Sequence, residues 1–217
     1  IRDCQSNPAG LWDNRFTQRS YWLNEIGQSA VIASQTQTLK AYVISDTVNE
    51  VLFMNFVYGS NIGVWLKDNA NVTVIGQGVD YSLNTVKLSD NACAVFTDAQ
   101  LSCSAGGSVA LLSDETYCGS TDVYNMTAWA VTANAIDIAG GNVSVCGGVF
   151  FQCGSYAAVA SGGNTLICGV SLNNYATAAY CLLEGAENFW AFGNLYKNGI
   201  TVSNDYNIKT EGGDFYE

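Results

Sequence analysis

The sequence predicts an all-β fold, a right-handed parallel β-helix of about seven coils of roughly 20–25 residues each. A motif, Asn-x-x-x-x-Gly, begins at Asn71, Asn142, Asn164 and Asn188. The intervals between these asparagines are 71, 22 and 24 residues, and 71 is about three times the shorter intervals. A second short apolar segment follows the motif in each unit, and no helical periodicity separates the two. Repeats of this length with two or three strands are typical of a solenoid.

The coils can be followed in order along the chain. Asn49 precedes the apolar segment EVLFMNFV and lies 22 residues before Asn71. Between 91 and 141 the motif is degraded, but NACAVFTDAQL and TDVYNMTAWAV occupy the two expected positions. The second strand of each coil is expected within 61–68, 84–90, 108–115, 134–141, 156–163 and 178–185. The β-helix is therefore predicted for 48–200, with equivalent positions stacked about 4.8 Å apart.

The two ends of the chain do not follow the repeat. Residues 1–47 are expected to form an N-terminal cap or neck region, because an open end of a β-helix exposes unpaired strand edges. Residues 201–217 are polar and acidic and are expected to form a C-terminal cap or tail. The chain begins with Ile1 and shows no signal-peptide layout, so we expect it to be a processed or excised piece of a longer protein.

The composition favours a β-rich protein and excludes several kinds of partner. Apolar residues make up 48% and charged residues 12%, with 22 glycines and one proline. No run of about 18 apolar residues is present, so we expect no membrane insertion. The net charge is −11, and no basic residue lies between Lys87 and Lys197. Because nucleic acid and anionic lipid both require a basic surface, neither is expected as a partner.

The eight cysteines are expected to be mostly free thiols in a chain that folds in a reducing compartment. Cys146, Cys168 and Cys181 lie inside apolar segments, where a free cysteine acts as a small buried hydrophobic residue. A disulfide that involves Cys103 and Cys118, both near glycine turns, stays open. The chain has no His and no CxxC pair, so we expect no metal site and no cofactor.

Two columns of stacked residues follow from the repeat. Ile75, Cys146, Cys168 and Ala191 are expected at one interior position of successive coils, where Cys replaces Ile. Asn71 and Asn142 begin glycosylation sequons, as does Asn125. We favour a structural role for Asn71 and Asn142, in a shared turn with a left-handed backbone and hydrogen bonds to the stacked neighbours.

The segment GSNIGVWLKDNANVTVIGQGV at 59–79 resembles the pectin-lyase-like β-helix superfamily, in which a Gly-Ile-x-Leu strand and a turn precede an Asn-Val-x-Ile strand. Within that superfamily, the low charge, the cysteine-rich columns and the lack of a secretion signal are most similar to bacteriophage tailspikes and tail-fibre adhesins. The resemblance covers the repeat region. It implies a side-by-side homotrimer in the virion tail, assembled in the host cytoplasm, with a host capsule or lipopolysaccharide glycan and other tail proteins as partners.

Polysaccharide cleavage normally needs two carboxylates that flank the scissile bond. In polygalacturonase-type relatives these precede the strand that corresponds to NIGVWL or NTVKL, and in the equivalent stretches only Asp80 is acidic. Asp80 is therefore the one catalytic candidate, with no identified partner in the same chain. In a trimer, Asp98 or Asp122 of one subunit could pair with Asp80 of another. A further acidic column suits calcium or a solvated turn and contains Asp68, Asp90, Asp114 with Glu115, and Glu184. We favour the turn.

Carbohydrate binding without cleavage needs aromatic faces and planar polar groups. The expected groove-bearing face carries such side chains at Tyr58, Asn61, Asp80, Tyr81, Asn173, Asn174 and Tyr175. The sequence thus favours a viral tailspike or adhesin fragment that recognises a host surface polysaccharide. The alternatives are a polysaccharide depolymerase, either glycosidase or lyase, with an intersubunit or calcium-assisted site, and a structural β-helix shaft of a fibre.

Overall fold

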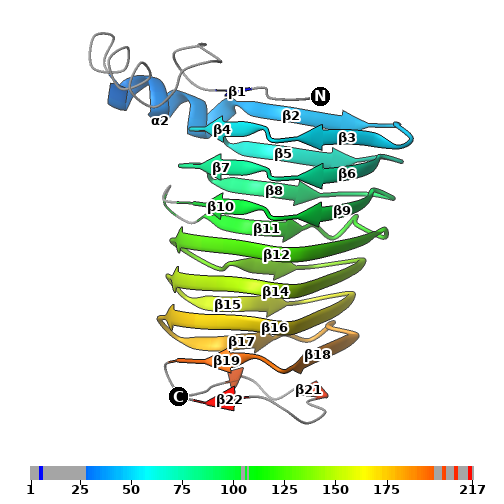
Figure 1. The fold of residues 1–217 in the computed structure, drawn as a ribbon, viewed down its shortest axis with the longest axis vertical. Coiled ribbons are helices and arrows are strands. Elements are labelled where there is room, and N and C mark those ends of the chain that lie inside the picture. Colours follow the sequence, from blue (N-terminus) through cyan, green and yellow to red (C-terminus); the bar gives the residue numbers. More distant parts are fainter. Residues whose placement is uncertain are drawn as a thin grey trace.

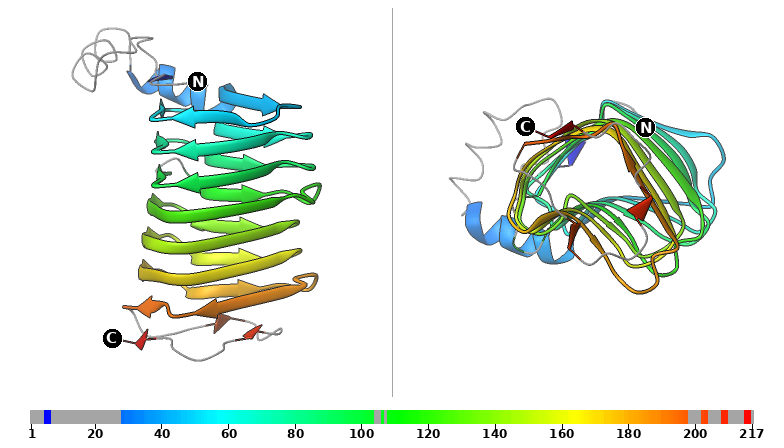
Figure 2. Two further views of the ribbon diagram at one scale, coloured as in Figure 1. Left: turned by 45° about the vertical axis from the view of Figure 1, so that its right-hand side comes forward. Right: turned by 90° about the horizontal axis from the view of Figure 1, so that it is seen from below.

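The chain forms a parallel β-solenoid of about seven turns, as the sequence predicts. The computed structural model describes residues 5–6, 28–103, 106, 108–197, 202–203, 208–209 and 215–216. Successive coils lie one above the other along a single axis (Figure 1). Viewed along that axis, the coils superpose and enclose the core (Figure 2).

Within the described residues, one parallel sheet contains eight strands in the order of the chain. These strands are β2 (Lys40–Ser45), β5 (Ile62–Lys67), β8 (Asn84–Leu88), β11 (Val109–Ser113), β13 (Ile136–Ile138), β15 (Tyr156–Ala160), β17 (Ala178–Leu182) and β20 (Val202–Ser203). The second strand predicted for each coil is confirmed in all six segments, from 61–68 to 178–185. We call this the eight-stranded sheet.

The remaining strands in the described part of the chain form a bent sheet of 14 strands. Its strands are β1 (Gln5–Ser6), β3 (Glu50–Phe53), β4 (Phe56–Tyr58), β6 (Asn71–Ile75), β7 (Gly78–Asp80), β9 (Cys93–Thr97), β10 (Gln100–Ser102), β12 (Ser120–Val131), β14 (Asn142–Cys153), β16 (Asn164–Tyr175), β18 (Asn188–Phe192), β19 (Leu195–Tyr196), β21 (Ile208–Lys209) and β22 (Phe215–Tyr216). The degraded repeats at 91–101 and 121–131 correspond to β9 with β10 and to β12. Each coil therefore keeps its place despite the loss of the motif.

Both end segments contribute to the stack. The strand β2 lies within the predicted N-terminal segment 1–47 and pairs with β5. The helix α2 (Gln28–Thr38) lies at the N-terminal end of the solenoid (Figure 1). Asn61 Nδ2 donates a hydrogen bond of 3.1 Å to the carbonyl of Thr36, which ties the end of the helix to the second coil. In the predicted tail 201–217, β20, β21 and β22 extend the pairing beyond β17, β18 and β19.

The core consists of columns of apolar side chains, one residue per coil. One such column contains Val74, Phe96, Val123, Val145, Ile167 and Ala191, all buried and in register. The prediction that Ile75, Cys146 and Cys168 lie at this interior position is wrong. These three do share a column, but it faces outward, next to the core column. The error is one residue, which in a β-strand reverses the direction of the side chain.

A left-handed residue bends each coil of the 14-stranded sheet. The glycine that ends the Asn-x-x-x-x-Gly motif has a positive φ in all four copies, as at Gly147 with φ 76°. In the degraded repeats Asp98 and Asn125 adopt the same conformation, at 55° and 56°. Asp and Asn tolerate this region better than other side chains with a Cβ atom. The motif therefore marks the bend, and the degraded copies retain it.

The described residues contain no helix that is long and apolar enough to span a membrane. The helix α2 has 11 residues, fewer than the roughly 20 needed to cross the hydrocarbon core of a bilayer.

Replacement of Leu172 by Ala is expected to lower the free energy of unfolding by about 2–5 kcal/mol, because Leu172 is fully buried and its removal leaves a cavity. Leu183→Ala is the matched control, because Leu183 is 41% exposed and its truncation should change stability by about 0.5 kcal/mol or less. Equilibrium denaturation of both variants gives the comparison. Equal losses would contradict the assignment of Leu172 to the core.

Candidate functional site

At the N-terminal end of the 14-stranded sheet, three of the predicted binding residues come together. Tyr58 in β4 pairs in register with Asp80 in β7. The rings of Tyr58 and Tyr81 stack with a centroid distance of 5.9 Å and an interplanar angle of 21°. Tyr81 has a φ of 54°, so a left-handed backbone turns its ring toward Tyr58. Asn61 is half-buried and its amide is bound to Thr36, so it belongs to the junction with α2.

The other predicted binding residues lie several coils away in the same sheet. Asn173 pairs with Phe151, which pairs with Trp129. The rings of Trp129 and Phe151 stack with centroids 6.2 Å apart and an interplanar angle of 10°, and Trp129 is 37% exposed. This aromatic pair, which the sequence analysis missed, lies between the two predicted groups. Asn174 is exposed, whereas Tyr175 is part of the core and is closed to a ligand.

Asp80 has no acidic neighbour on the strands that flank it. The strand on one side, β4, consists of Phe56, Val57 and Tyr58, and the strand on the other side, β10, consists of Gln100, Leu101 and Ser102. A carboxylate pair for glycoside hydrolysis is therefore not formed by Asp80 and the adjacent strands of this chain.

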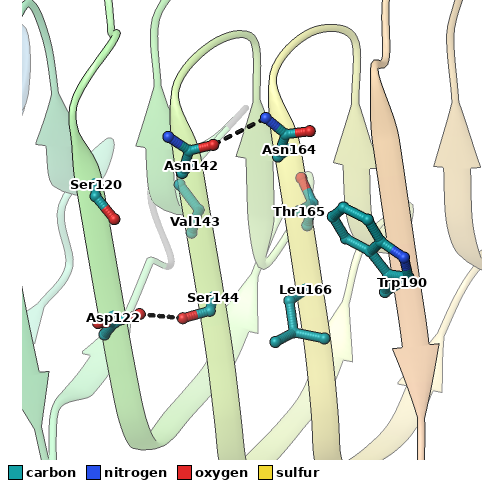
Figure 3. A pocket seen from close by; sticks show the side chains of 9 residues that line it. All are labelled: Ser120, Asp122, Asn142, Val143, Ser144, Asn164, Thr165, Leu166 and Trp190. Atoms are coloured by element: carbon teal, nitrogen blue, oxygen red, sulfur yellow. Dashed lines mark hydrogen bonds between the residues drawn. The ribbon is translucent and has the colours of Figure 1, made fainter.

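A pocket of about 420 Å³ lies on the outer face of the coils that contain β12, β14, β16 and β18. Figure 3 shows Asp122 and Ser144 on two neighbouring strands, with the indole of Trp190 on β18 at the opposite side. The hydroxyl of Ser144 donates a hydrogen bond to Oδ1 of Asp122. We call this the tryptophan pocket. It combines an aromatic face, a carboxylate and amide groups within one depression.

A ladder of asparagine side chains forms one edge of the tryptophan pocket. Asn164 Nδ2 donates to Asn142 Oδ1 at 2.8 Å (Figure 3). Asn188 Nδ2 donates to Asn164 Oδ1 at 2.7 Å. The predicted hydrogen bonds between stacked asparagines are thus found for Asn142. The predicted left-handed backbone is not, because among the motif residues positive φ belongs to the glycine. Asn71 lies in the same column but is followed by Cys93 and then Ser120.

A second pocket, of about 520 Å³, lies on the other side of the ladder, and Asn142 and Asn164 line both. Its floor is formed by the glycine pairs at 140–141 and 162–163, so we call it the glycine pocket. A Cβ atom on Gly163 would lie 2.3 Å from the carbonyl oxygen of Gly141, so the turns stack this closely only with glycine. The two pockets adjoin each other along the ladder.

Two carboxylates, Glu115 and Glu187, line the glycine pocket. Glu115 precedes β12 and Glu187 precedes β18, which places them three coils apart, or about 14 Å along the axis. Hydrolysing carboxylates lie no more than about 9.5 Å apart. Glu187 also accepts a hydrogen bond of 3.4 Å from Asn164 Nδ2. Glu115 and Glu187 are therefore too far apart to form a hydrolytic carboxylate pair with each other.

The acidic column at the turns is engaged by the protein itself. Oδ2 of Asp90 accepts a hydrogen bond of 3.2 Å from the backbone amide of Asp68. Asp114 accepts hydrogen bonds from Ser89 and Thr116 and pairs with Lys87 at 3.0 Å. Burial alone would raise the pKa of Asp114, but these donors hold it below its usual value. No group of three or more metal-ligating side chains occurs among the described residues.

Of the pocket residues Asp122, Ser144 and Trp190, the sequence analysis named only Asp122, as an intersubunit partner of Asp80 rather than as a binding residue. Each lies two residues after the first position of its strand, in one outward-facing column with Leu166. In the sequence, these three residues share only their position, two residues after the start of the repeat. That shared position identifies a surface column only when it is known which positions of the strand face outward.

Replacement of Asn164 by Ala removes hydrogen bonds to both neighbouring asparagines, so we expect the free energy of unfolding to fall by about 1–2 kcal/mol. Asn71→Ala is the control, because Asn71 is in the same column but its neighbour is Cys93. Thermal or chemical denaturation measures both. An equal effect of the two substitutions would show that the ladder adds no stability of its own.

Comparison of the chain with known protein families, with characterised proteins and with solved structures gives no significant match. The structural class, a parallel β-solenoid of about seven turns consistent with the β-helix superfamily, therefore follows from the geometry of the chain.

Proposed function

We propose that this protein is the β-helical part of a viral tailspike or tail-fibre adhesin that binds a host cell-surface polysaccharide without cleaving it. The observation that carries the proposal is the tryptophan pocket. Its indole face on Trp190 suits the CH groups of a pyranose ring, and Asp122 and Asn164 offer acceptors and donors for hydroxyl groups. Polar groups around an aromatic surface are the usual composition of a small-ligand site.

The repeat of the solenoid suits a repeating ligand. Equivalent groups recur every coil, about 4.8 Å apart, which is close to the rise per residue of an extended hexose polymer. The tryptophan pocket extends over four coils, from Asp122 on β12 to Trp190 on β18. We therefore place the polysaccharide along the solenoid axis, with successive sugars over successive coils.

Binding is favoured over cleavage by the positions of the carboxylates. Asp122 is the only carboxylate among the residues that line the tryptophan pocket, and Ser144 occupies one of its oxygens. Asp80, the catalytic candidate from the sequence, has no acidic residue on either flanking strand. The glycan is thus held by hydrogen bonds and aromatic contact.

The viral assignment also includes a homotrimer, in which three solenoids stand side by side in the virion tail with other tail proteins. Light scattering coupled to size-exclusion chromatography measures the molar mass in solution, and we expect three times the 23.1 kDa of one chain. A monomer mass at micromolar concentration would contradict the trimer, whereas polysaccharide binding is tested separately.

Trp190→Ala is expected to weaken binding of capsular polysaccharide or lipopolysaccharide at least tenfold, about 1.4 kcal/mol, because the aromatic side of the site is lost. Calorimetry or a glycan array measures the affinity. Trp129→Ala and Trp65→Ala are matched controls, on the aromatic pair and on the eight-stranded sheet, and should retain affinity. Loss of binding in Trp129→Ala alone would move the site to the aromatic pair, and no binding by the unmodified protein would favour the structural shaft.

Incubation with the bound polysaccharide is expected to release no new reducing ends and no unsaturated sugars. Release by the unmodified protein would support the depolymerase alternative. Asp80→Asn and Asp122→Asn would then be compared, since loss of release in one variant identifies the carboxylate involved.

A further inference from the structure

We propose that Cys146 and Cys168 form a redox-active dithiol, which a low-molecular-weight disulfide such as oxidised glutathione converts into a disulfide between adjacent coils. Cys146 lies in β14 and Cys168 in β16, and the two residues are direct partners in the parallel ladder. The bond forms whether or not the protein binds a polysaccharide.

The register brings the two side chains together. Direct partners on parallel strands have Cα atoms about 4.8 Å apart, inside the window of roughly 4.4–6.8 Å that disulfides span. Both side chains leave the same side of the sheet, because partners in register have the same orientation. The Cys146 thiol also contributes to raising the pKa of Cys168, as a neighbouring thiol does.

The dithiol is accessible from solvent. Both cysteines are partly exposed, in the outward-facing column that also contains Tyr124 and Phe192. The residue after each cysteine is a glycine at the left-handed bend. A Cβ atom on Gly147 or Gly169 would meet only one backbone nitrogen, at 3.9 Å, so no side chain covers this point.

The other described cysteines lack this combination of register and access. Cys103 and Cys153 are buried, and burial raises the pKa of each thiol to about 12. Cys93 and Cys118 are exposed, but Cys93 pairs in register with Ser120. The seven described cysteines are all free thiols, Cys103 and Cys118 included.

The exchange proceeds in two balanced steps. The Cys146 thiolate attacks one sulfur of oxidised glutathione, which gives a mixed disulfide and releases one glutathione thiolate. The Cys168 thiol then loses its proton and attacks the Cys146 sulfur, which releases the second glutathione. The protein loses two electrons and two protons, and the oxidised glutathione gains them. Burial and the Cys146 thiol raise the pKa of Cys168 to about 12, so we place Cys168 in the second step and expect the reaction to accelerate at alkaline pH.

The disulfide would fasten the strands that form the floor of the tryptophan pocket. Cys146 follows Ser144 by two residues and Cys168 follows Leu166 by two, and both of these line the pocket. Parallel partners keep their Cβ atoms near the coil spacing of about 4.8 Å, wider than the roughly 3.8 Å of a relaxed disulfide. The bond is therefore strained, and mild reductants should reverse it.

The test is oxidation of the native protein with oxidised glutathione at pH 8.5, followed by alkylation and mass spectrometry. Trypsin would leave both cysteines in one peptide, because no Lys or Arg lies between Lys87 and Lys197. Chymotrypsin is used instead, since it cleaves between the two cysteines at Phe150, Phe151 and Tyr156. The expected product is one linked peptide pair with the loss of two hydrogens, together with a Tm rise of roughly 5 °C. Excess glutathione should restore both thiols.

Single variants distinguish a specific disulfide between Cys146 and Cys168 from oxidation of any exposed thiol. Cys146→Ser and Cys168→Ser should each abolish the linked peptides and the Tm rise. Cys93→Ser with Cys118→Ser should leave both unchanged, although these thiols are exposed. Independent glutathione adducts on Cys146 and Cys168, a link between other cysteines, or no loss of thiols after prolonged oxidation would each overturn the proposal.

Discussion

In-register hydrogen bonding between successive coils is the constraint on which every other feature of this molecule depends. It requires each coil to bend at the same position. The left-handed residue in the middle of the 14-stranded sheet meets this requirement, as Gly147 and Gly169 do on adjacent coils. Without it, the two halves of a long strand such as β14 would not both remain paired with β12 and β16. The repeat motif is thus primarily a device for register.

Because the coils pair in register, residues that are one repeat apart in the sequence lie in contact in the structure. Residues 22 apart become direct neighbours, as Asn142 and Asn164 show, and a single side-chain type repeated along the chain becomes a column. The asparagine ladder, the Trp129–Phe151 stack and the Cys146–Cys168 pair are three chemical versions of this arrangement. Each stacked aromatic pair adds about 0.5–1.5 kcal/mol beyond its buried area, so these columns also stabilise the coils.

The eight-stranded sheet uses the same principle to different effect. Three lysines, Lys40, Lys87 and Lys67, lie 4.4, 5.0 and 5.7 Å from the ring centre of Trp65. Two of them are paired, with Asp114 for Lys87 and Asp68 for Lys67. The positive charges of Lys67 and Lys87 are therefore neutralised locally, and the contacts with Trp65 bind neighbouring coils together. The two pockets, in contrast, are lined by residues between Lys87 and Lys197, and this stretch of the sequence contains no basic side chain.

The solenoid, the approximate number of coils and the second strand of each coil from 61 to 185 could be predicted from the sequence, because the period survives even where the motif is degraded at 91–131. The strands β2, β20, β21 and β22 lie in segments that were expected to form the end caps. Tertiary structure decided which side of each strand faces the core. Apolar residues occur on both sides of β14 and β16, so alternation could not distinguish Val145 from Cys146, and the predicted interior column was displaced by one residue. Tertiary structure also decided the composition of the tryptophan pocket. Asp122 and Trp190 are 68 residues apart in the chain, and only the stacking of four coils brings them to one surface, because the register between strands depends on contacts that no local pattern encodes.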